Sequence, residues 1–392
     1  MRFPEFSEEW EHVALSEIAA RVTRKNKDNA SKLPLTISAQ YGLVDQISFF
    51  NKVVASADMS NYYLLRQGEF AYNKSYSSDY PWGAIKRLDR YPQGALSSLY
   101  ICFAVNDKVD SDFAVHYFES SKWHREVSNI AGEGARNHGL LNIAVGDFFD
   151  TKHRLPSSKE EQKKIAALLN LITERIATQI KIIEKLESLI RGIVETHYSQ
   201  CECINQVRIS ELGEPFSTMN MSKEYLSEEG NECILYGELF TTYGCVIKEV
   251  KSRTHISTNK ATVSQSNDLL FPASTTVDAM SLIAPSAICK EGVILGGDLF
   301  GVHVNKNYNN EYLSYLINYI YKSKLARYAQ GSTIIHLHYS DIKNATLLLP
   351  TIEEQNYLAH IMRVVEEKIN IEKDMLSKLY SQKAYLLSNL FI

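Results

Sequence analysis

The 392-residue sequence lacks the features of membrane and secreted proteins. No apolar run approaches the ~18–20 residues that a membrane-spanning helix needs. The opening Met1-Arg2-Phe3-Pro4-Glu5-Phe6 has no basic head followed by an apolar stretch, which is the pattern of a secretory signal. We therefore expect a cytoplasmic protein without membrane contact.

Cysteine is scarce and poorly spaced for metal binding. Only Cys201 and Cys203 lie close together among the six cysteines, and no second pair or histidine follows at zinc-finger spacing. We expect buried thiols in a reducing compartment and no metal ion on this chain.

Catalytic motifs and an excess of positive charge are also missing. The sequence has no Asn-Pro-Pro-aromatic or Asp-Pro-Pro-aromatic motif of amino methylation, no Gly-rich methyl-donor or dinucleotide loop, and no Gly-x-x-x-x-Gly-Lys phosphate loop. The 42 Lys and Arg residues face 46 Asp and Glu residues, for a net charge of −4. Any contact with nucleic acid must therefore come from local patches.

What the chain does contain is an internal duplication. The segment 155–162, Leu-Pro-Ser-Ser-Lys-Glu-Glu-Gln, matches 349–355, Leu-Pro-Thr-Ile-Glu-Glu-Gln, with one residue of slack. Three shorter matches occur in the same order: 13–18 with 207–212, 68–72 with 267–271, and 121–125 with 323–327. A period of roughly 200 residues is far longer than that of solenoid repeats and indicates duplicated domains.

The pattern predicts an α+β protein with two domains in tandem, related by a pseudo-twofold duplication and separated by two long antiparallel coiled-coil helices. The expected boundaries are 1–155 and 201–349 for the domains, and 156–200 and 350–392 for the helices. Short apolar runs bounded by Gly, Asn and Pro predict strands at 99–105, 268–271, 293–295 and 299–304, and helices are expected at 113–125 and 311–328.

The two long helices follow the two Leu-Pro pairs, with Ser157 and Thr351 as N-cap candidates. Apolar residues then alternate by three and four positions, which is typical of a coiled coil. The first ladder contains Ile165, Leu169, Ile172, Ile176, Ile183, Leu186, Ile190 and Ile193, and the second contains Leu358, Met362, Val365, Ile369, Leu376, Leu379 and Leu386.

One polar residue interrupts each ladder at its middle, Gln179 in the first and Glu372 in the second. If the helices pack antiparallel, these midpoints meet, and a polar residue in a seam sets the register at some cost in stability. The alternative is a chance substitution on a partly exposed seam.

The length of the first helix suggests a measuring role. Positions 156–198 would extend roughly 60 Å as a helix, which equals roughly 18 base pairs of duplex at about 3.4 Å per step. Such a rod could hold two readers over separated stretches of DNA, or it could simply space two domains or dimerise without any DNA.

Polar and aromatic residues gather in two predicted loop clusters of each domain. One cluster follows a strand and contains Asn73, Lys74, Ser75, Tyr76, Trp82, Lys86 and Arg87 in the first domain, and Ser274, Thr275 and Thr276 in the second. The other precedes each Leu-Pro and contains Arg136, Asn137 and His138, and then Ser332, Thr333, His336 and His338. Lys and Arg bind phosphates, and Asn, Ser, Thr and His bond to base edges. The alternatives are ordinary solvated loops or, for the histidines, a metal or catalytic site.

The duplicated Leu-Pro segments that run into long helices resemble type I restriction–modification specificity subunits. The likeness rests on Leu155-Pro156 with 161–165, Leu349-Pro350 with Glu354-Gln355, the segment 331–333, and the opening 9–18. It covers the whole chain, although Gly134-Ala135-Arg136 stands in the first half where the second has Gly331-Ser332-Thr333.

This resemblance implies a non-enzymatic DNA-reading subunit. Each domain would be a target-recognition domain for one part of a bipartite target in double-stranded DNA, and the helices would set the unread spacer. Two modification (methyltransferase) subunits would dock on the chain, and restriction/translocase subunits would join them. S-adenosylmethionine, ATP and Mg would belong to these partners, with no cofactor on this chain. The alternative is a protein-interaction scaffold with two binding modules and no DNA role.

Overall fold

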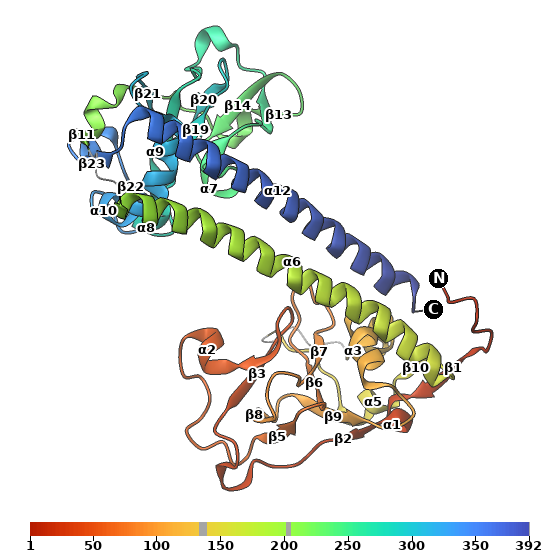
Figure 1. Ribbon diagram of the computed structural model, residues 1–392. Coiled ribbons are helices and arrows are strands. Elements are labelled where there is room, and N and C mark those ends of the chain that lie inside the picture. Colours follow the sequence, from red (N-terminus) through yellow and green to blue (C-terminus); the bar gives the residue numbers. More distant parts are fainter. Residues whose placement is uncertain (133–138, 201–204, 392) are drawn as a thin grey trace. The chain divides into compact units, whose positions relative to one another are not determined.

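The computed structural model describes residues 1–132, 139–200 and 205–391 (Figure 1). They form two compact units, Met1–Gln179 with Met375–Ile392, and Ile180–Asp374. Each unit contains one domain of mixed strands and helices together with parts of both long helices. The expected α+β class and the two long helices are thereby confirmed.

The domain of the first unit is built on two four-stranded sheets, in the orders β2-β9-β6-β7 and β4-β3-β8-β5. Its strands are β1 (Trp10–Ala14), β2 (Ala19–Arg21), β3 (Pro34–Ser38), β4 (Gly42–Asp45), β5 (Tyr63–Arg66), β6 (Phe70–Asn73), β7 (Ala84–Arg87), β8 (Gln93–Leu96), β9 (Ile101–Val105) and β10 (Lys152–Pro156). Its helices are α1 (Leu15–Ile18), η1 (Lys27–Asn29), α2 (Gln46–Phe50), α3 (Ser111–Glu119), α4 (His124–Ile130) and α5 (Val145–Asp150). The aromatic core includes the stacked rings of Phe70 and Phe103.

The domain of the second unit contains a five-stranded sheet, β12-β21-β17-β19-β15, and a four-stranded sheet, β13-β16-β14-β20. Its strands are β11 (Asn205–Arg208), β12 (Gly213–Ser217), β13 (Leu226–Ser227), β14 (Asn231–Leu235), β15 (Val246–Ile247), β16 (Ser252–Thr254), β17 (Asp268–Pro272), β18 (Ser274–Thr275), β19 (Ser286–Ile288), β20 (Ile294–Gly296), β21 (Leu299–Val304), β22 (Ile335–His336) and β23 (Thr346–Leu349). Its helices are η2 (Ile209–Glu211), η3 (Lys223–Tyr225), α7 (Glu238–Thr241), η4 (Thr258–Lys260), α8 (Ala279–Leu282), α9 (Asn310–Leu316), the π-helix η5 (Ile317–Tyr321), α10 (Lys322–Ala326) and α11 (Tyr339–Ile342).

The duplication seen in the sequence is visible in hydrogen bonds. β1 pairs antiparallel with β10 in the first domain, and β11 pairs antiparallel with β23 in the second. Directly after β1, the Glu17 carboxylate accepts a hydrogen bond from the Ala14 amide at 2.8 Å. Directly after β11, the Glu211 carboxylate accepts one from the Arg208 amide at 2.6 Å. The glutamate of the repeated Ser-Glu pair therefore caps a short helical turn in both domains.

The two long helices are α6 (Lys159–Gln200) and α12 (Ile352–Asn389) (Figure 1). Thr351 stands directly before α12, and its hydroxyl is 3.4 Å from the Glu354 amide, as expected of an N-cap. In α6 the equivalent residue is Ser158, which lies 3.4 Å from the Glu161 amide. The expected cap at Ser157 was one residue early, because the extra residue of the first Leu-Pro segment precedes the helix.

Within the first unit, the helix α3 contacts both long helices. The Lys383 ammonium near the end of α12 lies 3.0 Å from the Glu119 carboxylate. The His116 imidazole, one turn earlier in α3, is 2.8 Å from the side-chain oxygen of Asn170 near the start of α6. The end of α12 and the start of α6 therefore meet on the same helix, which is the arrangement of an antiparallel pair.

Within the second unit, Lys373 of α12 lies 2.9 Å from Glu187 of α6. Residues predicted to pair the helices are mostly buried: Ile165, Leu169, Ile172, Ile176, Gln179, Ile183 and Ile190 in α6, and Leu358, Met362, Ile369 and Leu386 in α12. Five others are half-buried: Leu186, Ile193, Val365, Leu376 and Leu379. Glu372 is also half-buried, so the polar residues of the seam are not fully exposed.

The expected helix at 113–125 is divided into α3 and α4. The break lies at residues 120–123, where the buried Trp123 indole donates a hydrogen bond to the Phe118 carbonyl at 3.0 Å. The strand expected at 99–105 begins only at Ile101, because Leu99 is exposed in a turn. Tertiary packing of the tryptophan outweighed the local helical pattern.

Candidate nucleic-acid interface

The two loop clusters predicted in the second domain form one two-stranded ribbon. Ser274 of β18 pairs with His336 of β22, and Thr275 pairs with Ile335. The Leu337 amide extends the contact by donating to the Ala273 carbonyl at 2.9 Å. Segments some sixty residues apart in the chain thus lie next to each other, and we call this pair the second ribbon.

The tip of the second ribbon is closed by a bridge between Gln330 and His336. Gly331 has a φ of +117°, and a Cβ atom there would lie 2.1 Å from the Ile334 carbonyl oxygen. Only glycine fits this turn, because any side chain would collide with the backbone. Ser332 and Thr333, both predicted to contact DNA, are exposed at this tip.

His336 and His338 extend from the second ribbon into solvent. Their rings are nearly parallel, with centroids 6.2 Å apart. The Nδ1 atom of His336 lies 4.0 Å from the Asp298 carboxylate. Both imidazoles are exposed and carry ring nitrogens suited to hydrogen bonds with base edges or phosphates.

The first domain has an equivalent pairing, which we call the first ribbon. Ser75 bridges to Leu140, the Tyr76 amide donates to the Gly139 carbonyl at 3.1 Å, and the Leu141 amide donates to the Lys74 carbonyl at 2.9 Å. Each ribbon thus begins directly after a strand of the main sheet, β6 in the first domain and β17 in the second. Three predicted contacts fall outside the described residues: Arg136, Asn137 and His138.

Within the first cluster, the predicted residues lie in different environments. Ser75 and Tyr76 are exposed, whereas Asn73, Lys74 and Trp82 are half-buried. The Asn73 side chain accepts a hydrogen bond from the Ser75 amide at 3.0 Å and so shapes the turn that leaves β6. The exposed pair is best placed to meet a ligand.

Lys86 and Arg87 are not loop residues, which corrects the sequence-based placement. They form the end of β7, where Arg87 is bound to Asp89 at 2.6 Å and to Asp112 at 2.7 Å. Lys86 lies 3.9 Å from Glu119, and burial lowers the pKa of the Lys86 ammonium. Cations that are already paired inside a domain have less charge to offer a phosphate.

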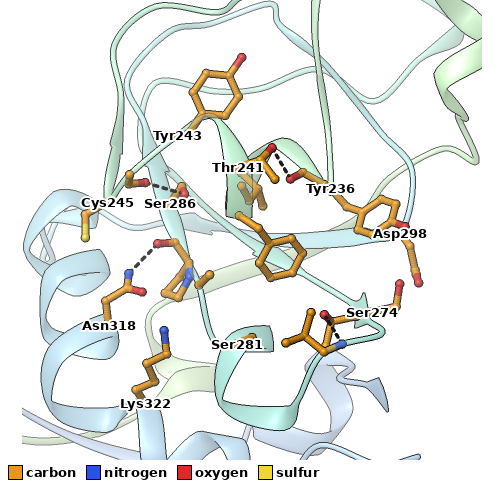
Figure 2. Close-up of a pocket in the computed structure, with 18 of the residues that line it drawn as sticks. Tyr236, Thr241, Tyr243, Cys245, Ser274, Ser281, Ser286, Asp298, Asn318 and Lys322 are labelled. Carbon is orange, nitrogen blue, oxygen red and sulfur yellow. Dashed lines mark hydrogen bonds between the residues drawn. The ribbon is translucent and has the colours of Figure 1, made fainter. Parts of the chain in front are cut away.

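A cavity of about 1060 Å³ opens beside the second ribbon (Figure 2). Four predicted residues line it: Ser274, Thr275, Thr276 and His336. Further lining residues come from α7 and the loops around it, from α8, from η5 and α10, and from α6; they include Tyr236, Thr241, Tyr243, Cys245, Asn318, Lys322 and Arg191. Segments from four parts of the second unit therefore form one concave surface.

The lining combines hydroxyl and amide groups with aromatic rings. The Ser286 hydroxyl donates to the Gly244 carbonyl, and the Asn318 amide donates to the Pro285 carbonyl, both at 2.8 Å. Figure 2 shows Asn318 and Lys322 reaching into the cavity from one side, with Tyr236, Thr241 and Asp298 on the other. Polar groups around aromatic surface are typical of a site that binds a polar ligand.

Burial shifts the pKa of several lining groups. It raises the pKa of the Cys245 thiol and of the Tyr243 phenol. The Tyr243 oxygen accepts a hydrogen bond from the Lys251 amide at 3.1 Å. Burial also lowers the pKa of the Lys322 ammonium, because a desolvated charge is costly.

Sequence reasoning missed the cavity residues outside the ribbon. Residues 236–244 read Tyr-Gly-Glu-Leu-Phe-Thr-Thr-Tyr-Gly and contribute much of one side of the cavity. They mix tyrosines and hydroxyl groups after a strand, as does the cluster predicted between Asn73 and Arg87 in the first domain. Applying that criterion evenly would have found them. Nothing local in the sequence indicated Asn318, Lys322 or Arg191.

Two negative observations concern the part of the chain that the structure describes. None of its helices combines the length and the apolarity that crossing a bilayer requires. No three His, Cys, Asp or Glu side chains of residues 1–132, 139–200 and 205–391 come together as a metal ion would require.

Comparisons with known proteins agree with this arrangement. Residues 205–380 match the family described as Type I restriction modification DNA specificity domain. The crystal structure of the S subunit of a type I restriction–modification system from M. genitalium is similar with a TM-score of 0.60 and 14% identity, over 100% of this chain and 99% of that chain.

A second similar chain comes from a structure that describes complex assembly and conformational transition of the type I R-M system. It has a TM-score of 0.57 and 16% identity, over 98% of this chain and 97% of that chain. At such identities the structural likeness speaks for the fold, and the family match adds the DNA specificity domain. Residues 205–380 thus form a type I restriction–modification DNA specificity domain, the strand pairing at its boundary is repeated in the first half, and the chain as a whole has the fold of type I S subunits.

Proposed function

We propose that this chain reads a bipartite target in double-stranded DNA, with one recognition domain for each part. The observation that carries the proposal is the pair of ribbons. They occupy the same place in the two domains, yet one presents Ser75 and Tyr76 and the other presents Thr275 and His336. Equal placement with unequal hydrogen-bonding groups is what two different half-sites require.

We also propose that the chain acts within a larger complex. Two modification subunits that bind S-adenosylmethionine would supply methylation, and restriction/translocase subunits that use ATP and Mg would supply cleavage. Support comes from the family of residues 205–380, which is a specificity domain rather than a catalytic one. The chain would provide the DNA sequence preference of that complex.

Methylome mapping tests this function directly. Cells that express the chain with the modification subunits encoded beside it should methylate one motif made of two half-sites with a fixed spacer. If the purified complex assembles and methylates but no bipartite motif emerges, the chain does not read DNA as proposed. A complex without any methyltransferase would instead favour a protein-interaction scaffold.

Paired variants assign each half-site to a domain. Replacing Ser332, Thr333 and His336 with Ala should relax the preference at one half-site and leave the other unchanged. Replacing Ser75 and Tyr76 with Ala should do the reverse, and so provides the matched control. A loss of preference at both half-sites from either set would contradict the assignment of one reader to each.

The spacer is tested by changing the length of both helices together. α6 has 42 residues and α12 has 38. Deletion of one heptad from each shortens a helix by about 10.5 Å, or roughly three base pairs. The expected result is a motif with a spacer shorter by about three base pairs, and an unchanged spacer would refute the measuring role of the helices.

A further inference from the structure

The helix that follows the main sheet is longer in the second domain than in the first. Its N-cap residues are Asp110 and Asn309, and a repeated Ser-Lys pair begins at Ser121 and Ser323. Asp110 and Ser121 are eleven positions apart in the first domain, whereas Asn309 and Ser323 are fourteen positions apart in the second. The second domain therefore has three more residues in this segment. The structure accommodates them in η5, a π-helix of five residues. Such π-helical insertions occur frequently at functional sites.

The insertion supplies residues of the cavity beside the second ribbon. Asn318 and Tyr319 belong to η5, Lys322 follows it directly, and all three line the cavity. The first domain has Ser120 at the position that corresponds to Lys322, next to the Ser-Lys pair. The second domain thus has a cation, directly after the π-helix, at a position where the first domain has a hydroxyl group.

Two cations of this cavity have no ion-pair partner among the described residues. Lys322 is half-buried, and the structure gives its ammonium neither a hydrogen bond nor a carboxylate within 4.0 Å in the described ranges. The same holds for Arg191, which reaches the cavity from α6. Lys86 and Arg87 of the first domain, in contrast, are paired with carboxylates.

Among the residues that line this cavity, Lys322 and Arg191 outnumber the acidic residues. Asp298 is the one acidic residue among those that line it, and it lies 4.0 Å from His336 rather than beside Lys322. Burial lowers the pKa of Lys322, and interactions with Cys245 and Asp278 offset this only in part. A half-buried cation without a partner is costly, and an anion in the cavity would remove that cost.

We propose that Lys322, together with Arg191, holds a phosphate group of the DNA backbone in this cavity, next to the second ribbon. The proposal rests on the proposed function and adds a contact that positions the duplex rather than reading its bases. The hydroxyl groups of Thr275 and Ser281 in the same lining can donate to the remaining oxygens of a phosphodiester, and the tyrosine rings provide apolar surface for its sugars.

The salt dependence of DNA binding separates a phosphate contact from a base contact. Fluorescence anisotropy on the complex of the full chain with its modification subunits would use a duplex with the mapped target and one of scrambled sequence. Lys322→Ala should weaken binding to both by a similar factor of roughly three to ten. The slope of log K against log salt, between about 50 and 200 mM, should fall by about 0.9 for the lost phosphate.

Lys324→Ala is the matched control. Lys324 lies two residues further in α10, but its ammonium donates to the Thr346 carbonyl at 3.0 Å and lies 5.2 Å from the centre of the Tyr321 ring. This variant should leave the slope unchanged. Lys322→Arg should restore most of the affinity, because it returns the charge.

A scan with neutral methylphosphonates locates the contact. At one position of the duplex the substitution should weaken binding by the wild-type complex and have little further effect on Lys322→Ala. An unchanged slope in Lys322→Ala, or a loss confined to one base pair of the target, would overturn the phosphate site while leaving the proposed function intact. Equal affinity of the wild-type complex for both duplexes would overturn the proposed function itself.

Discussion

A long helix joins each recognition domain at a Leu-Pro pair. The side-chain to backbone hydrogen bonds at these two junctions are alike, whereas the side-chain to side-chain contacts differ. Gln162 and Gln355 follow the two Leu-Pro pairs and are both buried. Gln162 donates to the Pro156 carbonyl at 2.9 Å and accepts from the Asp110 amide at 2.7 Å. Gln355 likewise donates to the Pro350 carbonyl at 2.9 Å and accepts from the Asn309 amide at 3.0 Å.

Further along the helices the chemistry differs. His116 of α3 meets Asn170 of α6 at 2.8 Å, whereas the Tyr315 hydroxyl of α9 donates to the Glu366 carboxylate of α12 at 2.5 Å. Backbone groups keep their positions as long as the fold is kept, so a glutamine that bonds to them remains useful in both copies. A side-chain pair needs only mutual complementarity, so it diverged after duplication.

The largest expected loss of stability comes from the buried residues between the long helices, and it tests whether the helices are packed equally well in the two units. Leu169 and Met362 stand seven residues after the two glutamines, and both are fully buried. Each change to Ala should destabilise its unit by about 2–5 kcal/mol through a cavity. Calorimetric unfolding of the full chain measures this. Leu171→Ala, at a residue 64% exposed on α6, is the control and should change little. If Met362→Ala left the free energy of unfolding unchanged, the packing around the long helices in the second unit would be less tight than in the first.

The glutamines should give a smaller and equal effect. Gln162→Leu and Gln355→Leu each leave a buried amide and a buried carbonyl without their partner, at a cost of about 1–3 kcal/mol. Denaturant unfolding of both variants, with Gln382→Leu on the exposed surface of α12 as control, compares the junctions. Unequal losses would break the equivalence that the matching hydrogen bonds indicate.

The smallest expected change in stability comes from Glu119 and Glu366, two carboxylates whose pKa values shift in opposite directions. Burial alone would raise the pKa of Glu119, but the hydrogen bond from His116 and the charges of Lys383 and Lys86 lower it to about 2. Burial raises the pKa of Glu366, partly offset by the bond from Tyr315. Stability from Glu119 is present above about pH 4.5 and is lost as the pH falls towards 2. Stability from Glu366 is present below about pH 4.5 and is lost as the pH rises through its raised pKa.

Unfolding of the two Gln variants at several pH values checks these signs. Glu119→Gln should be less stable than wild type by about 1 kcal/mol at pH 7, since the ion pairs are partly solvated. That difference should shrink at low pH. Glu366→Gln should gain on wild type as the pH rises. The same pH trend in both variants would show that the two junctions do not differ in charge as described.

The repeated features of the fold could be predicted because they are local. The heptad ladders around Leu169 and Met362 need only helical spacing, and a matched segment such as 13–18 and 207–212 needs only comparison along the chain. Even the turn at Gly331 follows from one residue type. The break at Trp123 could not be predicted, because it depends on where the indole finds its hydrogen-bond acceptor.

The candidate interface was predicted only in pieces. The sequence indicated Ser274 and His336 separately, without the pairing that makes them neighbours. It also assigned Lys86 and Arg87 to DNA, although carboxylates of the same domain already hold them. A cation is paired or unpaired according to residues that are distant in the sequence, so a local sequence pattern cannot predict it.

By itself, the sequence determined the duplication, the two long helices and the absence of known catalytic motifs, since these depend on spacing and residue type. Only the tertiary structure decided that β18 pairs with β22, that a cavity lies beside this ribbon, and that Lys322 and Arg191 face it without carboxylate partners among the described residues. The reason is physical: sheet order and strand register bring distant segments together, and the electrostatic state of a side chain depends on what they bring.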